Sequence, residues 1–202
     1  MALTIGVDVG GTKVAAGIVD EQGRVLATAM RDTPSDDPGR TEDVIVEVVG
    51  ELAASHDVEA VGVGAAGFVD AERSTVLFAP NLAWRDEPLR AGIEGRCELP
   101  VVIENDANAA AWAEARFGAG RGEDDVVVLT VGTGIGGGIV LGGRLLRGRF
   151  GVAGEIGHIN IVPDGRAALR VRAGGMLGAV RERPRVGAGG PGARRGLTSD
   201  GG

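Results

Sequence analysis

The sequence contains no tyrosine, and aromatic residues make up only 3% of its 202 residues. Aliphatic side chains must therefore form most of the core, and a hydrophobic content of 44% is sufficient for that. The chain has a single cysteine, Cys97, so it cannot form an internal disulfide. For the same reason, a cysteine-rich metal site cannot be built from this chain alone.

Positive charge is also scarce. Lys13 is the one lysine among 21 basic residues, and the net charge of −7 argues against a nucleic acid or an anionic membrane as the main partner. No apolar run approaches the length of a membrane span, and the N-terminus lacks the pattern of a signal peptide. We therefore expect a cytoplasmic protein with no nucleic-acid or membrane partner.

Hydrophobic periodicity predicts an alternation of strands and helices. The order is strand, strand, strand, helix, strand, helix, strand, helix and then further strands, which predicts an α/β fold. The apolar run at 60–66 has the length of a strand buried on both faces. Strands are predicted at residues 3–9, 14–19, 24–31, 60–66, 99–103, 125–131, 135–141 and 144–146, and helices at 41–54 and 106–117. The middle helix of the order lies between the strands at 60–66 and 99–103, and its bounds are not predicted.

The same patterns divide the chain into three parts. Residues 1–121 are predicted to form an N-terminal α/β domain, and residues 122–166 the opening of a similar second one. This second part repeats the strand, glycine turn and strand that begin the first. Residues 167–202 are rich in glycine and arginine and show neither helical nor strand periodicity.

A glycine turn links the first two predicted strands, in the sequence Asp8-Val9-Gly10-Gly11-Thr12-Lys13. Glycines at such a turn expose backbone N–H groups that can hold a phosphate. Thr12 would add a hydroxyl, Lys13 would add a charge, and Asp8 is suited to Mg²⁺. An ordinary hairpin with solvent-facing polar residues explains the same pattern, and the two interpretations stay open here.

A second glycine turn lies at Gly132-Thr133-Gly134, within a longer glycine-rich segment that ends at Gly138. The segment matches the G-x-G-x-x-G spacing literally, but a strand follows it where a dinucleotide site needs a helix. We interpret it as a second phosphate-holding turn. A glycine-rich hairpin is the alternative, although so much glycine is entropically costly without a reason.

The tripeptide Glu104-Asn105-Asp106 follows a predicted strand and opens a helix. Open α/β sheets bind their ligands at this strand edge, and a helix N-terminus favours an ionised carboxylate. Asp106 could accept a proton from an alcohol that attacks phosphorus, and Asn105 could hold a neighbouring hydroxyl. Asn and Asp are also the commonest helix N-caps, and the tripeptide alone favours that structural role.

Further polar residues complete the set of candidates. Glu155 could grip two sugar hydroxyls, and His158 could bind a hydroxyl, ligate zinc or serve only the structure. Asn81 and Trp84 lie in a loop after Phe78-Ala79-Pro80, and both residue types are frequent in sugar sites and in ordinary loops.

Taken in order, these segments resemble the ROK family of sugar kinases and repressors over residues 4–165. The resemblance implies an actin-like ATPase (ribonuclease H-like) fold with two α/β domains and a cleft. It implies ATP-dependent phosphorylation of glucose, with Mg²⁺, and a homo-oligomer for the intact protein. Asp106 would be the catalytic base, and the two glycine turns would hold the phosphates of ATP. The residues implied to line the sugar are Gly67, Asn81, Asn105, Glu155 and His158.

Within the family the resemblance is closest to the bacterial glucokinases, because the chain starts at the first phosphate turn and repressors carry a helix-turn-helix before it. A kinase for fructose, mannose or an N-acetyl amino sugar is an alternative. A sugar-binding regulator without catalytic activity is another, as is a shortened chain that lacks activity.

The resemblance stops after Gly165. The family pattern continues with a Cys-x-Cys-Gly-x-x-Gly-Cys zinc loop, whose ligands would join His158, and then an acidic sugar ligand. This sequence has no cysteine there. Synonymous codons can be selected from the genetic code for the residues from Ala168 onward. When the same bases are read in the frame that starts one base later, they encode a Cys-Gly-Cys-Gly-Arg-Glu-Gly-Cys-Trp-Glu segment. We therefore hypothesise that residues from about 167 are out of frame, which would leave the second domain truncated and oligomer formation in doubt.

Overall fold

A mixed five-stranded sheet forms the centre of the computed structural model, which describes residues 2–132 and 134–159. Its strands are β1 (Thr4–Val9), β2 (Lys13–Val19), β3 (Val25–Asp32), β4 (Ala60–Ala65) and β8 (Val101–Asn105), in the order β3-β2-β1-β4-β8. The first three strands are antiparallel, while β4 runs parallel to both β1 and β8. The carboxyl ends of β1, β4 and β8 therefore meet at one edge of the sheet.

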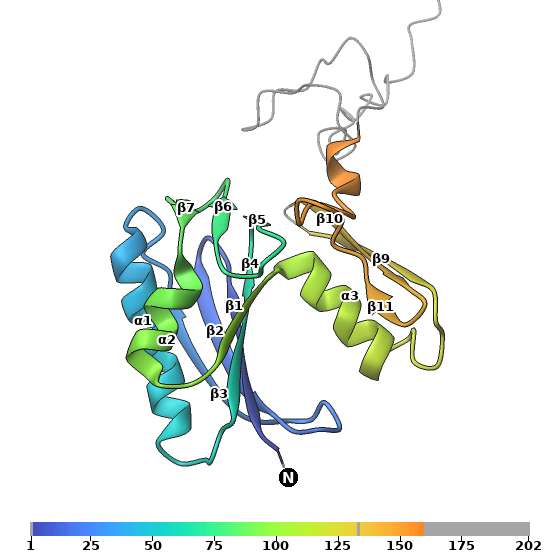
Figure 1. Cartoon of the computed structure of the whole chain (residues 1–202). Helices are drawn as coiled ribbons and strands as arrows, with labels where there is room; N and C mark the ends of the chain where they lie inside the picture. The colour runs from blue at the N-terminus through green and yellow to red at the C-terminus, as the bar shows by residue number, and fades with distance from the viewer. Residues whose placement is uncertain (1, 133, 160–202) are drawn as a thin grey trace, which may run out of the picture.

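Helices cover the two faces of this sheet unequally (Figure 1). Helices α1 (Pro38–Ala53) and α2 (Leu89–Cys97) lie side by side on one face, whereas α3 (Asp106–Phe117) leaves the end of β8 on the other side. Asp37 caps α1 by accepting a hydrogen bond from the amide of Arg40, and Pro38 begins the helix. Cap and proline together explain why α1 starts before the predicted residue 41.

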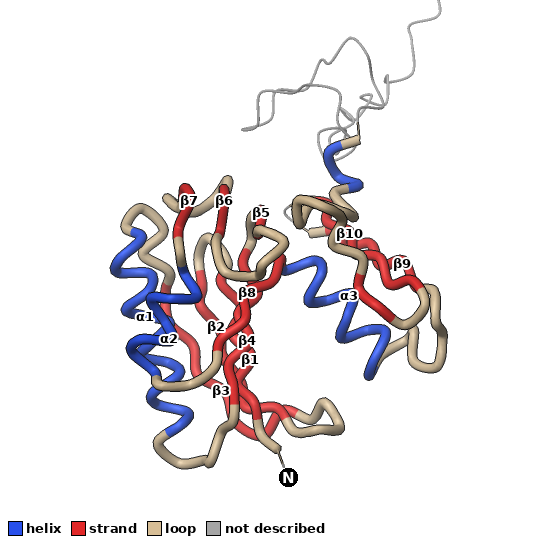
Figure 2. Tube along the Cα trace, in the orientation of Figure 1, coloured by secondary structure: helices blue, strands red, loops and turns tan. Residues whose placement is uncertain are grey.

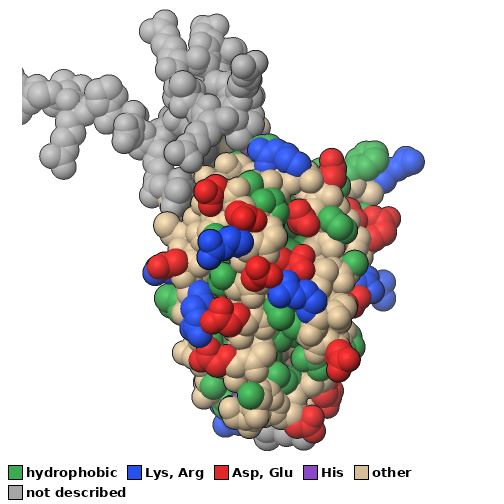
Figure 3. Space-filling view, turned by 90° about the vertical axis from the view of Figure 1, so that its left-hand side faces the viewer, with side chains coloured by type: hydrophobic (Ala, Val, Ile, Leu, Met, Phe, Trp, Pro, Cys, Tyr) green, Lys and Arg blue, Asp and Glu red, His purple; other side chains and the backbone are tan. Residues whose placement is uncertain are grey.

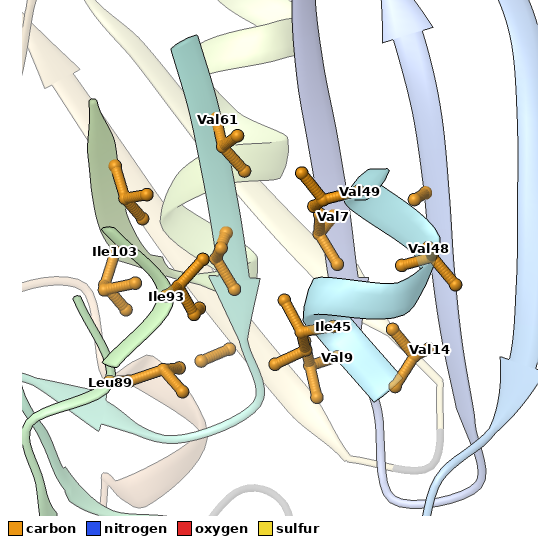
Figure 4. Close-up of a cluster of buried hydrophobic side chains, with 14 of the residues drawn as sticks. Val7, Val9, Val14, Ile45, Val48, Val49, Val61, Leu89, Ile93 and Ile103 are labelled. Carbon is orange, nitrogen blue, oxygen red and sulfur yellow. The ribbon is translucent and has the colours of Figure 1, made fainter. Parts of the chain in front are cut away.

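The core lies between the sheet and helices α1 and α2 (Figure 4). In β1 the apolar residues alternate with Gly6 and Asp8, so one face of the strand is buried and the other is exposed. The apolar stripe of α1 packs onto that buried face. The largest fully buried side chains include Ile5, Ile18, Ile45, Val48, Val61, Leu89, Ile93, Ile103 and Trp84.

Two smaller antiparallel sheets complete the described residues (Figure 2). One consists of β5 (Phe68–Val69), β6 (Val76–Phe78) and β7 (Arg85–Glu87). The other consists of β9 (Val126–Val131), β10 (Ile135–Leu141) and β11 (Arg144–Leu145), and it packs against α3. A single turn of 3-10 helix, η1 (Ile156–His158), follows and contacts β10.

The predicted α/β class is confirmed, and each predicted strand and helix is present with ends shifted by up to three residues. The expectation that residues 60–66 are buried on both faces was wrong. Val61, Val63 and Ala65 are buried, but Gly62 and Gly64 lie on a face that is only partly covered. The domain boundary near residue 122 falls in the connection between α3 and β9 and stays a prediction. The tail from residue 167 lies outside the described residues.

Charges of both signs are interspersed on the face shown in Figure 3. Among the described residues, ion pairs join Arg31 to Glu47 and Glu51, and Arg96 to Glu42 and Asp43. In the described part of the chain, every helix is too short or too polar to cross a membrane.

Candidate active site

The candidate residues gather where β1, β4 and β8 end. Strand register places Asp8 beside Gly64, Gly64 beside Glu104, and Ala65 beside Asn105. Because the three strands are parallel, their carboxyl ends lie at the same level. The segments containing Asp8 and Asp106, nearly 100 residues apart in sequence, therefore flank the strand that carries Gly64.

The sequence left open whether Asn105 or Asp106 is the N-cap of α3, and the structure shows that it is Asn105. Asn105 is the N-cap of α3: its Oδ1 accepts a hydrogen bond of 3.0 Å from the amide of Asn108. Its Nδ2 donates to the carbonyl of Gly67 at 3.0 Å and to Oδ1 of Asp106 at 3.1 Å. Asp106 is the first helical residue, and its Oδ1 also accepts from the amide of Ala107 at 2.9 Å. The cap is thus Asn105, and Asp106 is not needed for it.

Three carboxyl groups influence one another in this region. Partial desolvation at the end of β8 raises the pKa of Asp106 above its ordinary value although the residue is exposed, and the charge of Asp8 raises this pKa further. Partial desolvation also raises the pKa of Asp8, which lies on the open face of β1, and that of Glu155, and for Glu155 the charge of Asp106 adds to the effect. Carboxylates with raised pKa values in one place are typical of sites that move protons. A raised pKa makes Asp106 a stronger base toward an alcohol than an aspartate of ordinary pKa.

Gly64 and Gly67 have no side chains, and both lie close to Asn105 or Asp106. A Cβ at Gly64 would lie 3.8 Å from Cα of Asp106, on the face that Asp8 also occupies. A Cβ at Gly67 would lie 2.6 Å from the carbonyl oxygen of Phe78, closer than any real Cβ contact. Gly67 is therefore fixed as glycine by the neighbouring backbone, and its own carbonyl holds Asn105. The structure thus brings the predicted sugar residues Gly67 and Asn105 together.

The first glycine turn lies beside another predicted sugar residue. The amide of Gly10 donates to the carbonyl of Lys13 at 3.0 Å and closes the turn. A Cβ at Gly11 would lie 3.0 Å from Cβ of Asn81, so the turn packs directly against that loop. Thr12 is exposed. The ammonium of Lys13 pairs with Asp32, and both side chains are largely exposed. Phosphate binding by Lys13 would therefore require it to leave or share that partner.

The second glycine turn joins β9 to β10. The amide of Gly132 donates to the carbonyl of Gly134 at 2.9 Å, and both glycines are exposed with open space around them. Thr133 lies outside the described residues. The space around both glycines permits the close approach of a ligand to the backbone.

Two further glycines, Gly136 and Gly138, have a role that the sequence analysis missed. On the face of β10 toward α3, a Cβ at Gly136 would lie 2.8 Å from Cβ of Ala107, and one at Gly138 would lie 2.4 Å from Cβ of Ala111. The strand therefore packs on α3 backbone to backbone. Their spacing of two residues, which places them on one face of a strand, was the available signal.

Glu155 and His158 lie together in and beside η1. Nε2 of His158 is 3.7 Å from Oε2 of Glu155, and the imidazole ring lies 5.6 Å from the ring of Phe68. Both residues line a cavity of about 400 Å³ with Phe68, Leu77, Phe78 and Val152. Trp84, whose type is frequent in sugar sites, is fully buried in the core and cannot contact a sugar.

Zinc binding by His158 stays a prediction. Residues 2–132 and 134–159 contain no group of three or more His, Cys, Asp or Glu side chains placed to hold a metal ion. Cys97 is the last residue of α2, whereas His158 lies in η1. Magnesium has different needs, because it is bound through one or two carboxylates together with the phosphates of a substrate. Asp8 fits that requirement.

Comparison with known proteins identifies the class to which this fold and site belong. The model of the ROK family matches residues 4–169, and the chain belongs to the ROK family. The solved ROK structures that it resembles have the actin-like ATPase fold, so the fold expected from the sequence is confirmed.

Glucokinases are among its most similar relatives. The chain is 56% identical over 165 residues to glucokinase from Streptomyces coelicolor, covering 82% of this chain and 52% of that protein. It is 40% identical over 160 residues to N-acetyl-D-glucosamine kinase from Vibrio cholerae, covering 79% and 53%. A ROK glucokinase from Streptomyces griseus, solved with glucose and AMPPNP, has a TM-score of 0.82 and 58% identity, covering 88% and 56%. The chain thus spans about half the length of these relatives.

Proposed function

We propose that this chain carries the sugar-binding half of a glucokinase that transfers the γ-phosphoryl group of ATP to the 6-hydroxyl of glucose. The observation that carries the proposal is the carboxylate of Asp106, which hydrogen bonds from Asn105 and from the amide of Ala107 hold at the ligand-binding edge of the sheet. Identity to the glucokinases is higher than to the N-acetyl-D-glucosamine kinase, which favours glucose over an N-acetyl amino sugar.

Asp106 would act as the general base. Its free carboxylate oxygen would accept the proton of the sugar hydroxyl. At the same time the hydroxyl oxygen of the sugar would attack the γ-phosphorus, and the bond from that phosphorus to the leaving ADP oxygen would break. Hydrogen bonds from Asn105 and from the amide of Ala107 hold the other oxygen, Oδ1, and so fix the orientation of the carboxylate. This fixed orientation supports general-base catalysis, which requires close and correctly aimed groups.

The remaining site residues would bind and orient the two substrates. Asn81, Glu155 and His158 offer amide, carboxylate and imidazole groups to sugar hydroxyls. Backbone amides of the Gly10–Thr12 and Gly132–Gly134 turns would donate hydrogen bonds to phosphate oxygens, where negative charge develops. Mg²⁺ entering with ATP would neutralise phosphate charge, and Asp8 would hold it. Closure of the two parts of the protein would exclude water from the transferred group.

Binding and turnover test different parts of this proposal. Calorimetry on the 202-residue chain measures whether glucose and ATP bind to it at all. Asn105→Ala should weaken glucose binding, because it removes the cap of α3 and the amide that holds Asp106. A chain that binds neither substrate would contradict the proposal for this chain. A substrate panel of glucose, mannose, fructose and N-acetylglucosamine then decides between glucose and the other sugars.

A further inference from the structure

Glu104 precedes the two site residues and has more polar partners than a strand residue needs. Its Oε1 accepts hydrogen bonds from the amide of Asn105 at 3.1 Å and from Nδ2 of Asn108 at 3.2 Å. Its Oε2 accepts from Nε of Arg147 at 2.7 Å. The side chain is only 12% exposed, so these contacts, and not water, satisfy the carboxylate.

The partners of Glu104 come from separate parts of the chain. Asn108 lies in the first turn of α3, next to Asp106. Arg147 follows β11 and belongs to the strand unit that carries the Gly132–Gly134 turn. Arg73, in the connection between β5 and β6, places its Nε 3.6 Å from the same Oε2. One carboxylate therefore ties the base-bearing helix to the phosphate-turn strands and to the β5–β6 connection.

A second, apolar contact links the same two parts. Gly138 of β10 packs against the first turns of α3, where a Cβ would lie 2.9 Å from the carbonyl of Ala107 and 3.3 Å from Cα of Asn108. Strand β10 begins directly after the Gly132–Gly134 turn. Packing of Gly138 and the Arg147–Glu104 pair therefore both connect the strands beside this turn to the N-terminal part of α3.

We propose that Glu104 is a positioning residue that holds Asn105 and Asp106 in their places, and that Arg147 couples it to the strands carrying the second phosphate turn. What the positioned groups do rests on the proposed function. The coupling itself does not, because it follows from the contacts of Glu104.

A purely stabilising ion pair is the competing explanation, and a second pair in the chain provides a matched control. Nε of Arg31 lies 3.1 Å from Glu47, and the Arg31 side chain is 38% exposed against 30% for Arg147. The Arg31 pair joins β3 to α1, on the other face of the sheet. Arg31→Met and Arg147→Met therefore remove guanidinium groups of similar exposure, but only Arg147→Met acts on Asp106.

Amide hydrogen exchange on the full chain measures the coupling without any need for turnover. The amide of Asn108, bonded to Asn105, reports on the first turn of α3, and the amide of Val7 in β1 reports on global opening. In Arg147→Met we expect exchange at Asn108 to accelerate by roughly tenfold while Val7 is unchanged. Arg31→Met should leave Asn108 unchanged, and Arg147→Lys should restore most of the protection because its charge can still reach Glu104.

Glucose affinity, measured by calorimetry on the same variants, tests whether the coupling reaches the sugar. We expect Arg147→Met and Glu104→Gln to bind glucose about tenfold more weakly than Arg31→Met does. Unchanged exchange at Asn108 in Arg147→Met, or equal effects in the two methionine variants, would overturn the positioning role. If the parent chain binds no glucose, the proposed function fails, and the exchange data alone then decide the role of Glu104.

Discussion

Replacing Gly138 by alanine tests the close packing between β10 and α3. The added Cβ would lie 2.4 Å from Cβ of Ala111, 2.9 Å from the carbonyl of Ala107 and 3.3 Å from Cα of Asn108. Carbon atoms prefer separations of about 3.5–4.0 Å, so strand and helix must move apart by roughly 1 Å. Most of the contacted atoms are backbone or Cβ atoms, which cannot rotate out of the way.

The size of the effect follows from two opposing terms. Overpacking a tight contact costs about 1–3 kcal/mol. Alanine also restricts the unfolded chain, which stabilises by about 0.4–1 kcal/mol. We therefore expect Gly138→Ala to lower the free energy of unfolding by about 1–2 kcal/mol. Because the displaced helix carries Asp106, glucose affinity should fall as well.

Gly50→Ala is the matched control, with the opposite expected sign. Gly50 is exposed within α1, and a Cβ there would meet no atom within 4 Å. Alanine is favoured over glycine inside a helix by about 1 kcal/mol, so this variant should be more stable than the parent. Urea unfolding followed by circular dichroism gives the free energy of unfolding of both variants. The comparison requires that the dependence of this free energy on urea concentration is the same in each variant and in the parent. The reasoning fails if Gly138→Ala is as stable as the parent, or if both variants shift in the same direction.

Three further predictions concern the carboxylate of Asp106, Gly67 and the residues after Arg166. Partial desolvation raises the pKa of Asp106 above 3.8, so the native state binds its proton more tightly than the unfolded chain and loses stability as pH rises through that window. Asp106→Asn should therefore be more stable than the parent at pH 7, and denaturant titrations should show this gain disappearing in acid. Gly67→Ala should weaken glucose binding measured by calorimetry, because its Cβ would press on the carbonyl of Phe78 and displace the carbonyl that holds Asn105. Sequencing the gene beyond the codon for Arg166 should show the Cys-Gly-Cys-Gly segment in the next reading frame, and a gene without it would end the frameshift hypothesis.

Much of the fold follows from periodicity in the sequence. The alternation in β1 and the apolar spacing in α1 fixed both elements and their buried faces, because each has one face in the core. The bounds of α2 and the strands β5 to β7 were not predicted. The two-residue and three-residue strands are too short to show a period. In α2, charged residues and Gly92 interrupt a weak apolar pattern.

The candidate site was predictable as a set of residues, but not as an arrangement. The tripeptide at residues 104–106 could not show which member caps α3, because both Asn and Asp are good caps. The backbone geometry decides it in favour of Asn105. The partnership of Glu104 with Arg147 was also hidden, because it joins residues that are 43 positions apart. Such contacts depend on tertiary packing, which no local pattern specifies.

The role of Asp106 as the base is tested most directly by comparing glucose phosphorylation and glucose binding in the parent and in Asp106→Asn, using a protein expressed with the hypothesised shift in reading frame corrected. The amide keeps the size of the side chain but cannot accept the proton. The turnover number should fall by about 10²–10⁴, the usual contribution of a general base, while the glucose dissociation constant changes only slightly. An asparagine variant that turns over at the parent rate would contradict the account.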